Sequence, residues 1–158
     1  MRKILIAYFS ASGVTKKVAE HMADAVGADL YEIVPEEPYT EADVRWKNPF
    51  ARCNKEWFKK LPVPAAGRCE NFGEYDLVLI GSPIWYGCAP VVVNSFAEKH
   101  DFTGKKVALF ATSISSRMGR TAEKFMPYLN GKGELIADRR ILPEESEEIL
   151  AEWVNSLL

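Results

Sequence analysis

The chain has 158 residues and a formal net charge of −2, and 47% of its residues are hydrophobic. This length predicts a single domain over residues 1–158 with a sizeable core. The small negative net charge differs from the excess of basic residues that is typical of a nucleic-acid-binding protein. No apolar run approaches the ~20 residues of a membrane span. The cysteines Cys53, Cys69 and Cys88 are odd in number and lack metal-ligand spacing, so we expect reduced thiols in a cytoplasmic protein without a metal site.

The stretch from residue 3 to residue 27 predicts a strand followed by a helix. Residues 3–9 are mostly apolar and too few for a buried helix, which indicates a strand buried on both faces of a sheet. From Val18 to Val26, apolar side chains recur at helical spacing, and Gly27 is a favourable residue to end the helix. Residues 10–15 therefore join a buried strand to a helix N-terminus.

This junction offers the groups that bind a phosphate. The first backbone N–H groups of a helix have no partner within it, and the helix dipole adds roughly half a positive charge there. Ser10, Ser12 and Thr15 add hydroxyl groups, and Gly13 lets the backbone approach a ligand closely. An ordinary capped helix is the alternative, because Ser and Thr are also preferred cap residues.

The next part of the chain predicts an edge strand and a long connection. Residues 28–34 alternate polar and apolar side chains, as an edge strand does. Residues 36–75 contain several prolines and form a connection of unusual length. A short helix is predicted within it, because four side chains follow helical spacing: Trp46, Phe50, Cys53 and Trp57. They form either a satellite core on the sheet or a flap over a bound aromatic ligand.

The remaining elements complete an alternating pattern. Residues 76–82 and 105–111 predict two more buried strands, and Leu135 with Ile136 marks a short last one. Helices are predicted with Pro90 at the first helical position, over residues 119–126, and from about Pro143, the last with an inner face of Ile149, Leu150, Trp153, Val154 and Leu157. Strands that alternate with helices in this way indicate an α/β fold, with a doubly wound five-stranded parallel sheet between two helical layers.

Three loops are expected at the carboxyl ends of the buried strands, where such sheets bind ligands: residues 10–15, 83–88 and 112–119. The second loop carries Trp85 and Tyr86, and aromatic side chains in a loop are costly unless they cover something apolar. Packing against a neighbouring loop or a dimer partner is the alternative for both residues. A phosphate site beside a site for a planar ring describes a mononucleotide such as FMN.

The sequence resembles the flavodoxin family, particularly its short bacterial members, in residues 7–20, 75–87 and 102–113. The resemblance implies the strand order 2-1-3-4-5 with FMN at the switch point, a rule for which flavodoxin itself is a standard example. By position, the residues that would contact FMN are Ser10, Ala11, Ser12, Gly13, Val14 and Thr15 at the phosphate, Pro83, Ile84, Trp85, Tyr86 and Gly87 along the ring, and Thr112, Ser113 and Ile114 at the ring edge or ribityl chain.

Two positions depart from the family pattern. The family often has Asn in place of Val14, and two glycines in place of Ile114 and Ser115. If those glycines need a positive φ or a close approach to the ring, Ile114 would weaken FMN binding without changing the fold.

The resemblance implies flavin-based redox chemistry without a dedicated catalytic side chain, because the cofactor carries the reaction. Our first hypothesis is an FMN-dependent oxidoreductase that passes electrons from a reduced donor to a small acceptor such as a quinone. The alternatives are a one-electron carrier that docks to redox partner proteins and a flavin-free binding module. The small net charge argues against the carrier, because carriers of this family tend to be strongly acidic. The sequence is compatible with a homodimer, and neither a nucleic acid nor a membrane is expected as a partner.

Two further side chains have simple interpretations. Cys88 follows the aromatic loop and is expected to be a buried bystander thiol, with a position near the flavin as the alternative. His100 is expected at the surface or as a helix cap.

Overall fold

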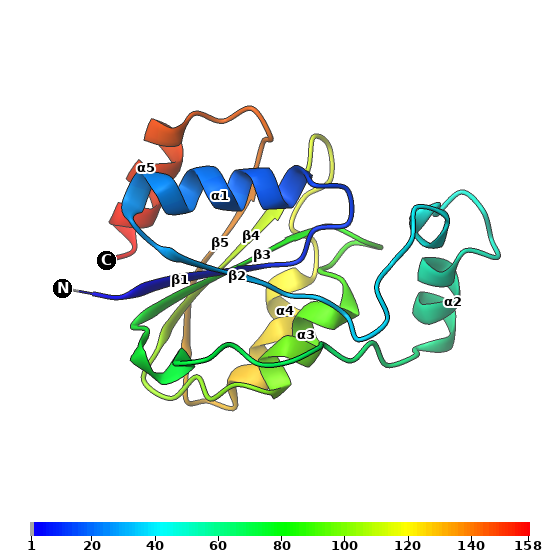
Figure 1. Cartoon of the computed structure of the whole chain (residues 1–158), viewed down its shortest axis with the longest axis horizontal. Coiled ribbons are helices and arrows are strands. Elements are labelled where there is room, and N and C mark those ends of the chain that lie inside the picture. The colour runs from blue at the N-terminus through cyan, green and yellow to red at the C-terminus, as the bar shows by residue number, and fades with distance from the viewer. Residues whose placement is uncertain (1) are drawn as a thin grey trace.

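The computed structural model describes residues 2–158. Within these residues, five strands form one parallel sheet in the order β2-β1-β3-β4-β5: β1 (Ile4–Tyr8), β2 (Asp29–Glu32), β3 (Leu77–Pro83), β4 (Lys106–Thr112) and β5 (Glu134–Ile141). Helices α1 (Val14–Val26) and α5 (Glu147–Ser156) cover one face, and α3 (Val91–Glu98) and α4 (Thr121–Phe125) cover the other (Figure 1). The predicted fold class and strand order are confirmed.

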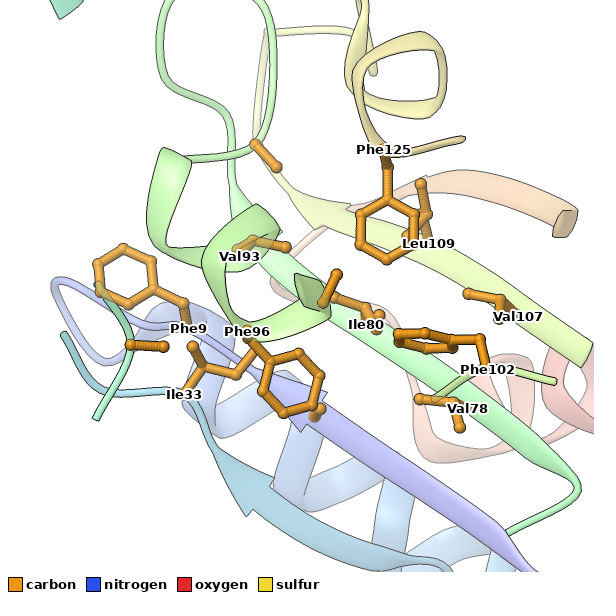
Figure 2. Close-up of a cluster of buried hydrophobic side chains, with 14 of the residues drawn as sticks. Phe9, Ile33, Val78, Ile80, Val93, Phe96, Phe102, Val107, Leu109 and Phe125 are labelled. Carbon is orange, nitrogen blue, oxygen red and sulfur yellow. The ribbon is translucent and has the colours of Figure 1, made fainter. Parts of the chain in front are cut away.

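The central strands are buried on both faces because their alternate side chains enter two separate cores. In β1, Leu5 belongs to the core beneath α3 and α4, whereas Ile6 belongs to the core beneath α1 and α5. Figure 2 shows part of the first core, where Ile80 of β3 and Leu109 of β4 lie near Phe125 of α4. Both cores fix the strand ends that carry the three predicted loops.

The bounds of the last strand and the last helix differ from those that the sequence predicted. The last strand, β5, is longer than the two residues expected, because the polar stretch 138–140 continues it at the sheet edge. Helix α5 begins at Glu147 rather than near Pro143, and Ser146 caps it by accepting a hydrogen bond from the backbone N–H of Ile149. Ile149 itself is exposed, so its predicted place on the inner face is wrong.

The long connection has three short helices: η1 (Ala42–Val44), α2 (Arg52–Lys59) and η2 (Phe72–Glu74). Helix α2 lies beyond the carboxyl edge of the sheet, to the right in Figure 1. It begins after Pro49, so Trp46 and Phe50 precede it and are exposed by 67% and 78%. The satellite-core interpretation therefore fails for these two residues, whereas Cys53 is buried and Trp57 is half-buried.

The helices of the second layer, α3 and α4, also have bounds that differ from the predicted ones. After α4, the chain continues through Pro127 as a 3₁₀ turn, η3 (Met126–Leu129), because proline is tolerated in a first helical turn. Pro90 occupies the N-cap of α3 rather than its first helical position. Among the helices of residues 2–158, none has the length and apolar character that crossing a membrane requires.

Candidate cofactor site

The three predicted loops meet at the carboxyl edge of the sheet through direct contacts. The hydroxyl groups of Thr15 and Thr112 lie 2.7 Å apart and join the first loop to the third. The backbone N–H of Arg120 donates to the carbonyl of Gly87 at 2.8 Å, which joins the third loop to the second. Residues predicted from three separate parts of the sequence thus form one continuous surface.

The first loop leaves the N-terminus of α1 open. Gly13 precedes the helix in the left-handed region, with φ of 91°, and its N–H donates to the Ser10 hydroxyl at 3.1 Å. No side chain of the described residues caps α1, and its first turn contains no acidic residue. The N–H groups and the positive end of the dipole are therefore free to receive an external anion.

The N-terminus of α5 provides a contrast, whereas α2 and α3 resemble α1 in having neither a side-chain cap nor an acidic residue in the first turn. The N-terminus of α5 has a side-chain cap from Ser146, and Glu147 and Glu148 lie in its first turn. These groups neutralise the positive end of α5 from within the chain. At α1, the corresponding positions are taken by Val14 and Thr15, and the exposed Lys16 and Lys17 follow them. The residues present at α1 therefore fit a phosphate group.

The second loop is a tight turn built on two left-handed residues. Trp85 and Cys88 exchange both backbone hydrogen bonds, at 2.8 and 3.2 Å. Tyr86 and Gly87 between them have φ of 54° and 77°, as a type I′ turn requires. A left-handed tyrosine is unusual, and its side chain is held in place by three residues of α2: Cys53, Asn54 and Trp57.

Both aromatic side chains of this loop pack on protein partners. The Trp85 ring makes edge contacts with Phe9 and Tyr39, with centroids 5.6 and 5.3 Å apart. The Tyr86 ring stacks on Trp57 with a centroid separation of 5.0 Å, and its hydroxyl donates to the amide oxygen of Asn54. Packing against neighbouring segments, one of the two predicted interpretations, therefore accounts for these contacts.

The same side chains nevertheless line a cavity of about 280 Å³. Its walls come from the long connection, the second loop and the third loop, and are formed by Val44, Trp46, Cys53, Ile84, Trp85, Tyr86 and Ser116. The volume is near the lower end of small-molecule sites, and most of the lining is apolar or aromatic, as a planar ring requires. The exposed Trp46 thus belongs to a cavity wall, which agrees with the flap interpretation.

The predicted site residues divide between this cavity and its surroundings. Ile84, Trp85 and Tyr86 line the cavity, whereas Pro83, Gly87, Thr112, Ser113, Ile114 and the first-loop residues 10–15 lie outside its lining. The prediction missed Val44, Trp46, Cys53 and Ser116 as lining residues. The spacing of Trp46 and Cys53 in the long connection was the sequence signal that could have found two of them.

The third loop is ordered by its own hydrogen bonds. Ser113 donates its N–H to the carbonyl of Ile141 at 3.3 Å, and its hydroxyl accepts from the N–H of Ser116 at 2.7 Å. Ile114 is 79% exposed and is not among the residues with positive φ in the described chain. The backbone at position 114 therefore does not demand glycine, and Ile114 is accommodated without strain.

Two titratable groups beside the cavity are held in their neutral forms. Burial raises the pKa of the Cys88 thiol, against the opposing charges of Lys124 and Arg120. Burial also raises the pKa of the Tyr86 hydroxyl, which remains a hydrogen-bond donor. Cys88 is buried and points its sulfur at the Trp85 carbonyl, 3.6 Å away, which suits a bystander thiol.

Comparison with known proteins places this site in a family. The sequence profile of the flavodoxins matches residues 3–157. A candidate flavoprotein from Bacteroides eggerthii is 38% identical, with a TM-score of 0.89 over 99% of this chain and 98% of the other. A flavoprotein from Lactobacillus acidophilus, solved in complex with FMN, is 25% identical, with a TM-score of 0.73 over 98% of this chain and 99% of the other.

More distant structures share only the fold. Flavodoxin 1 from Bacillus cereus is 16% identical, with a TM-score of 0.57 over 98% of this chain and 96% of the other. No curated protein matches the sequence. Since the profile match covers nearly the whole chain, this protein belongs to the flavodoxin family.

Proposed function

We propose that this protein binds FMN at the three loops and acts as an oxidoreductase, passing electrons from a reduced donor to a small acceptor such as a quinone. FMN is the cofactor supported by membership of the flavodoxin family and by the FMN complex of the Lactobacillus acidophilus protein. The uncapped N-terminus of α1, at the carboxyl edge of the sheet, is the observation that carries the proposal. Its N–H groups and the positive end of its dipole have no partner among the described residues and would bind a phosphate.

The position of the cavity supports the same assignment. The open helix end and the aromatic cavity are separate, and the contact between Thr15 and Thr112 connects the loops that carry them. A mononucleotide has this same division, with a charged phosphate at one end and a planar ring at the other. The polar groups of residues 10–15 would hold the phosphate, and the side chains of Ile84, Trp85 and Tyr86 would lie against the ring.

The bound flavin would supply the redox chemistry, and the protein would supply binding, orientation and the electrostatic setting. The N–H groups at the start of α1 would bind the phosphate and fix the direction of the molecule. The apolar walls would exclude water from one side of the ring. The neutral Tyr86 hydroxyl adds no charge to the site.

An FMN titration of the purified protein, followed by quenching of flavin fluorescence, tests the cofactor assignment. We expect saturable quenching at micromolar FMN. The Gly13→Asp variant should bind about tenfold more weakly than Gly13→Asn at low salt, because both substitutions strain a left-handed position and only the first repels the phosphate. Equal affinities of the two variants would contradict a phosphate at this loop.

The enzymatic part of the proposal needs a separate measurement. Steady oxidation of a reduced nicotinamide by the FMN-loaded protein, dependent on an added quinone, would support an oxidoreductase. Reduction of the bound flavin in two well-separated one-electron steps, without turnover of small acceptors, would support the carrier alternative instead.

A further inference from the structure

Asn54 is a buried polar residue that connects two walls of the cavity. It lies in the first turn of α2 and is 5% exposed. Its Nδ2 group donates to the carbonyl oxygens of Trp46 and Asn48 at 2.8 and 2.7 Å. Its Oδ1 atom accepts a hydrogen bond from the hydroxyl of Tyr86. Both ends of the amide are therefore used, and they face different segments of the chain.

The two segments lie in different parts of the chain, and Asn54 hydrogen-bonds to both. Trp46 lies in the long connection, ahead of α2, and Tyr86 lies in the turn after β3. Both side chains line the cavity, whereas Asn54 does not. Nearby, Tyr86 also stacks on Trp57, another residue of α2. The first turn of α2 thus joins the wall that contains Trp46 to the wall that contains Tyr86.

We propose that Asn54 is a positioning residue for the flavin ring, which sets the separation of the Trp46 and Tyr86 walls. The identity of the ring rests on the function proposed above, whereas the link between the walls rests on the hydrogen bonds alone. An amide suits this position because it donates at one end and accepts at the other. A carboxylate lacks the donor, and an aliphatic side chain of similar shape lacks both groups.

Two variants separate the two sides of the link. Asn54→Asp keeps the acceptor for Tyr86 but turns a second oxygen toward the carbonyls of Trp46 and Asn48, which it repels. Tyr86→Phe removes the hydroxyl and leaves the Trp46 side intact. Asn155→Asp, on the exposed surface of α5 across the sheet, makes the same change of charge far from the cavity and serves as the control.

The walls can be observed without FMN. The chain has four tryptophans, so its four indole N–H signals can be followed by ¹⁵N NMR and the signal of Trp46 assigned with Trp46→Phe. We expect Asn54→Asp to shift the Trp46 signal, Tyr86→Phe to shift the Trp57 signal, and Asn155→Asp to shift neither. An unchanged Trp46 signal in Asn54→Asp would overturn the positioning role.

FMN binding then tests whether the link serves the cofactor. We expect Asn54→Asp to weaken FMN binding roughly tenfold, the usual effect of a lost buried hydrogen bond. Acidification should restore part of this affinity, because a protonated carboxyl regains one donor. A shifted Trp46 signal with unchanged FMN affinity would overturn the proposal. If the unmodified protein fails to bind FMN, the proposed function fails, and the Trp46 signal alone decides the role of Asn54.

Discussion

The hydroxyl groups of Thr15 and Thr112 lie 2.7 Å apart, although 97 positions separate the two residues in the sequence. Both side chains are buried. Thr15 lies in the first turn of α1, and Thr112 is the last residue of β4. Each hydroxyl therefore depends on the other for its hydrogen bond. This contact holds the open helix end beside the third loop, so it bears directly on the candidate site.

Valine substitutions test the contact between these two residues. Thr15→Val or Thr112→Val alone should lower the free energy of unfolding by about 1–3 kcal/mol, because each leaves a buried hydroxyl without its partner. The double variant should cost less than the sum of the two single ones, because it removes both hydroxyls. Urea unfolding measures all three, and strict additivity would show that the hydroxyls do not interact.

Much of the fold followed from hydrophobic runs in the sequence. Residues 3–9, 76–82 and 105–111 were assigned as strands because they are apolar on both faces, and they form β1, β3 and β4. The loops at their ends followed from the same pattern, because parallel strands bring their carboxyl ends to one edge. For residues 10–15 the sequence left an ordinary capped helix as the alternative to a phosphate site, and the structure shows no side-chain cap at α1.

The parts that the sequence did not reveal depend on contacts between distant residues. Val44 lines the cavity because the connection returns past the sheet edge, and no local pattern specifies that path. The role of Asn54 depends on partners on both sides of α2. The length of β5 was missed because charged residues at an edge strand do not produce an apolar run.

Gly119, at the end of the third loop, should tolerate no side chain without a displacement of the backbone. A Cβ atom at this position would lie 2.1 Å from the carbonyl oxygen of Gly87, and the backbone φ is 54°. Gly119→Ala should therefore displace the third loop from the second, and it should lower stability by more than Gly104→Ala. At Gly104 φ is 73° and a Cβ would meet no atom within 4 Å, so strain of about 1–2 kcal/mol is the whole cost.

Thermal unfolding of the two glycine variants gives the comparison. We also expect Gly119→Ala to weaken FMN binding, because the N–H of Arg120, next in the chain, donates to the same Gly87 carbonyl. Equal losses of stability in both variants would mean that the two loops separate at little cost.

His100 should make stability depend on pH. It is half-buried and matches the helix-cap alternative of the prediction. Its Nδ1 donates to the carbonyl of Phe96, in the last turn of α3, at 2.7 Å, and its Nε2 accepts from the N–H of Cys69 at 2.9 Å. Burial lowers its pKa below the ordinary 6.5, and the charges of Arg68 and Lys99 lower it further. Protonation would also remove the acceptor that Cys69 uses.

The sign of the effect follows from this lowered pKa. As pH falls, the unfolded chain takes up the proton first, so the contribution of His100 is complete above pH 6.5 and is lost as the pH drops toward the folded pKa. Urea unfolding from about pH 7.5 to about pH 5 should show this loss, at about 1.4 kcal/mol for each unit of pKa difference. The His100→Gln variant should lose less over the same range, and an identical pH dependence would assign the effect to other groups.

Ile114 should prove neutral for folding and should not limit FMN binding. The side chain is 79% exposed, and the backbone adopts no positive φ at this residue. Ile114→Ala removes the side chain, whereas Ile114→Gly also frees the backbone. We expect unfolding free energies within about 1 kcal/mol of the original for both variants, with the glycine variant the less stable because its unfolded chain is more flexible.

FMN titration of the same two variants decides what the departure from glycine at this position means. If the loop is already in its binding conformation, Ile114→Gly should bind FMN no more tightly than Ile114→Ala, because added flexibility must be lost again on binding. Tighter binding by Ile114→Gly alone would show that the ring needs a closer approach of the backbone than Ile114 permits. Tighter binding by both variants would instead show that the isoleucine side chain itself obstructs the ring.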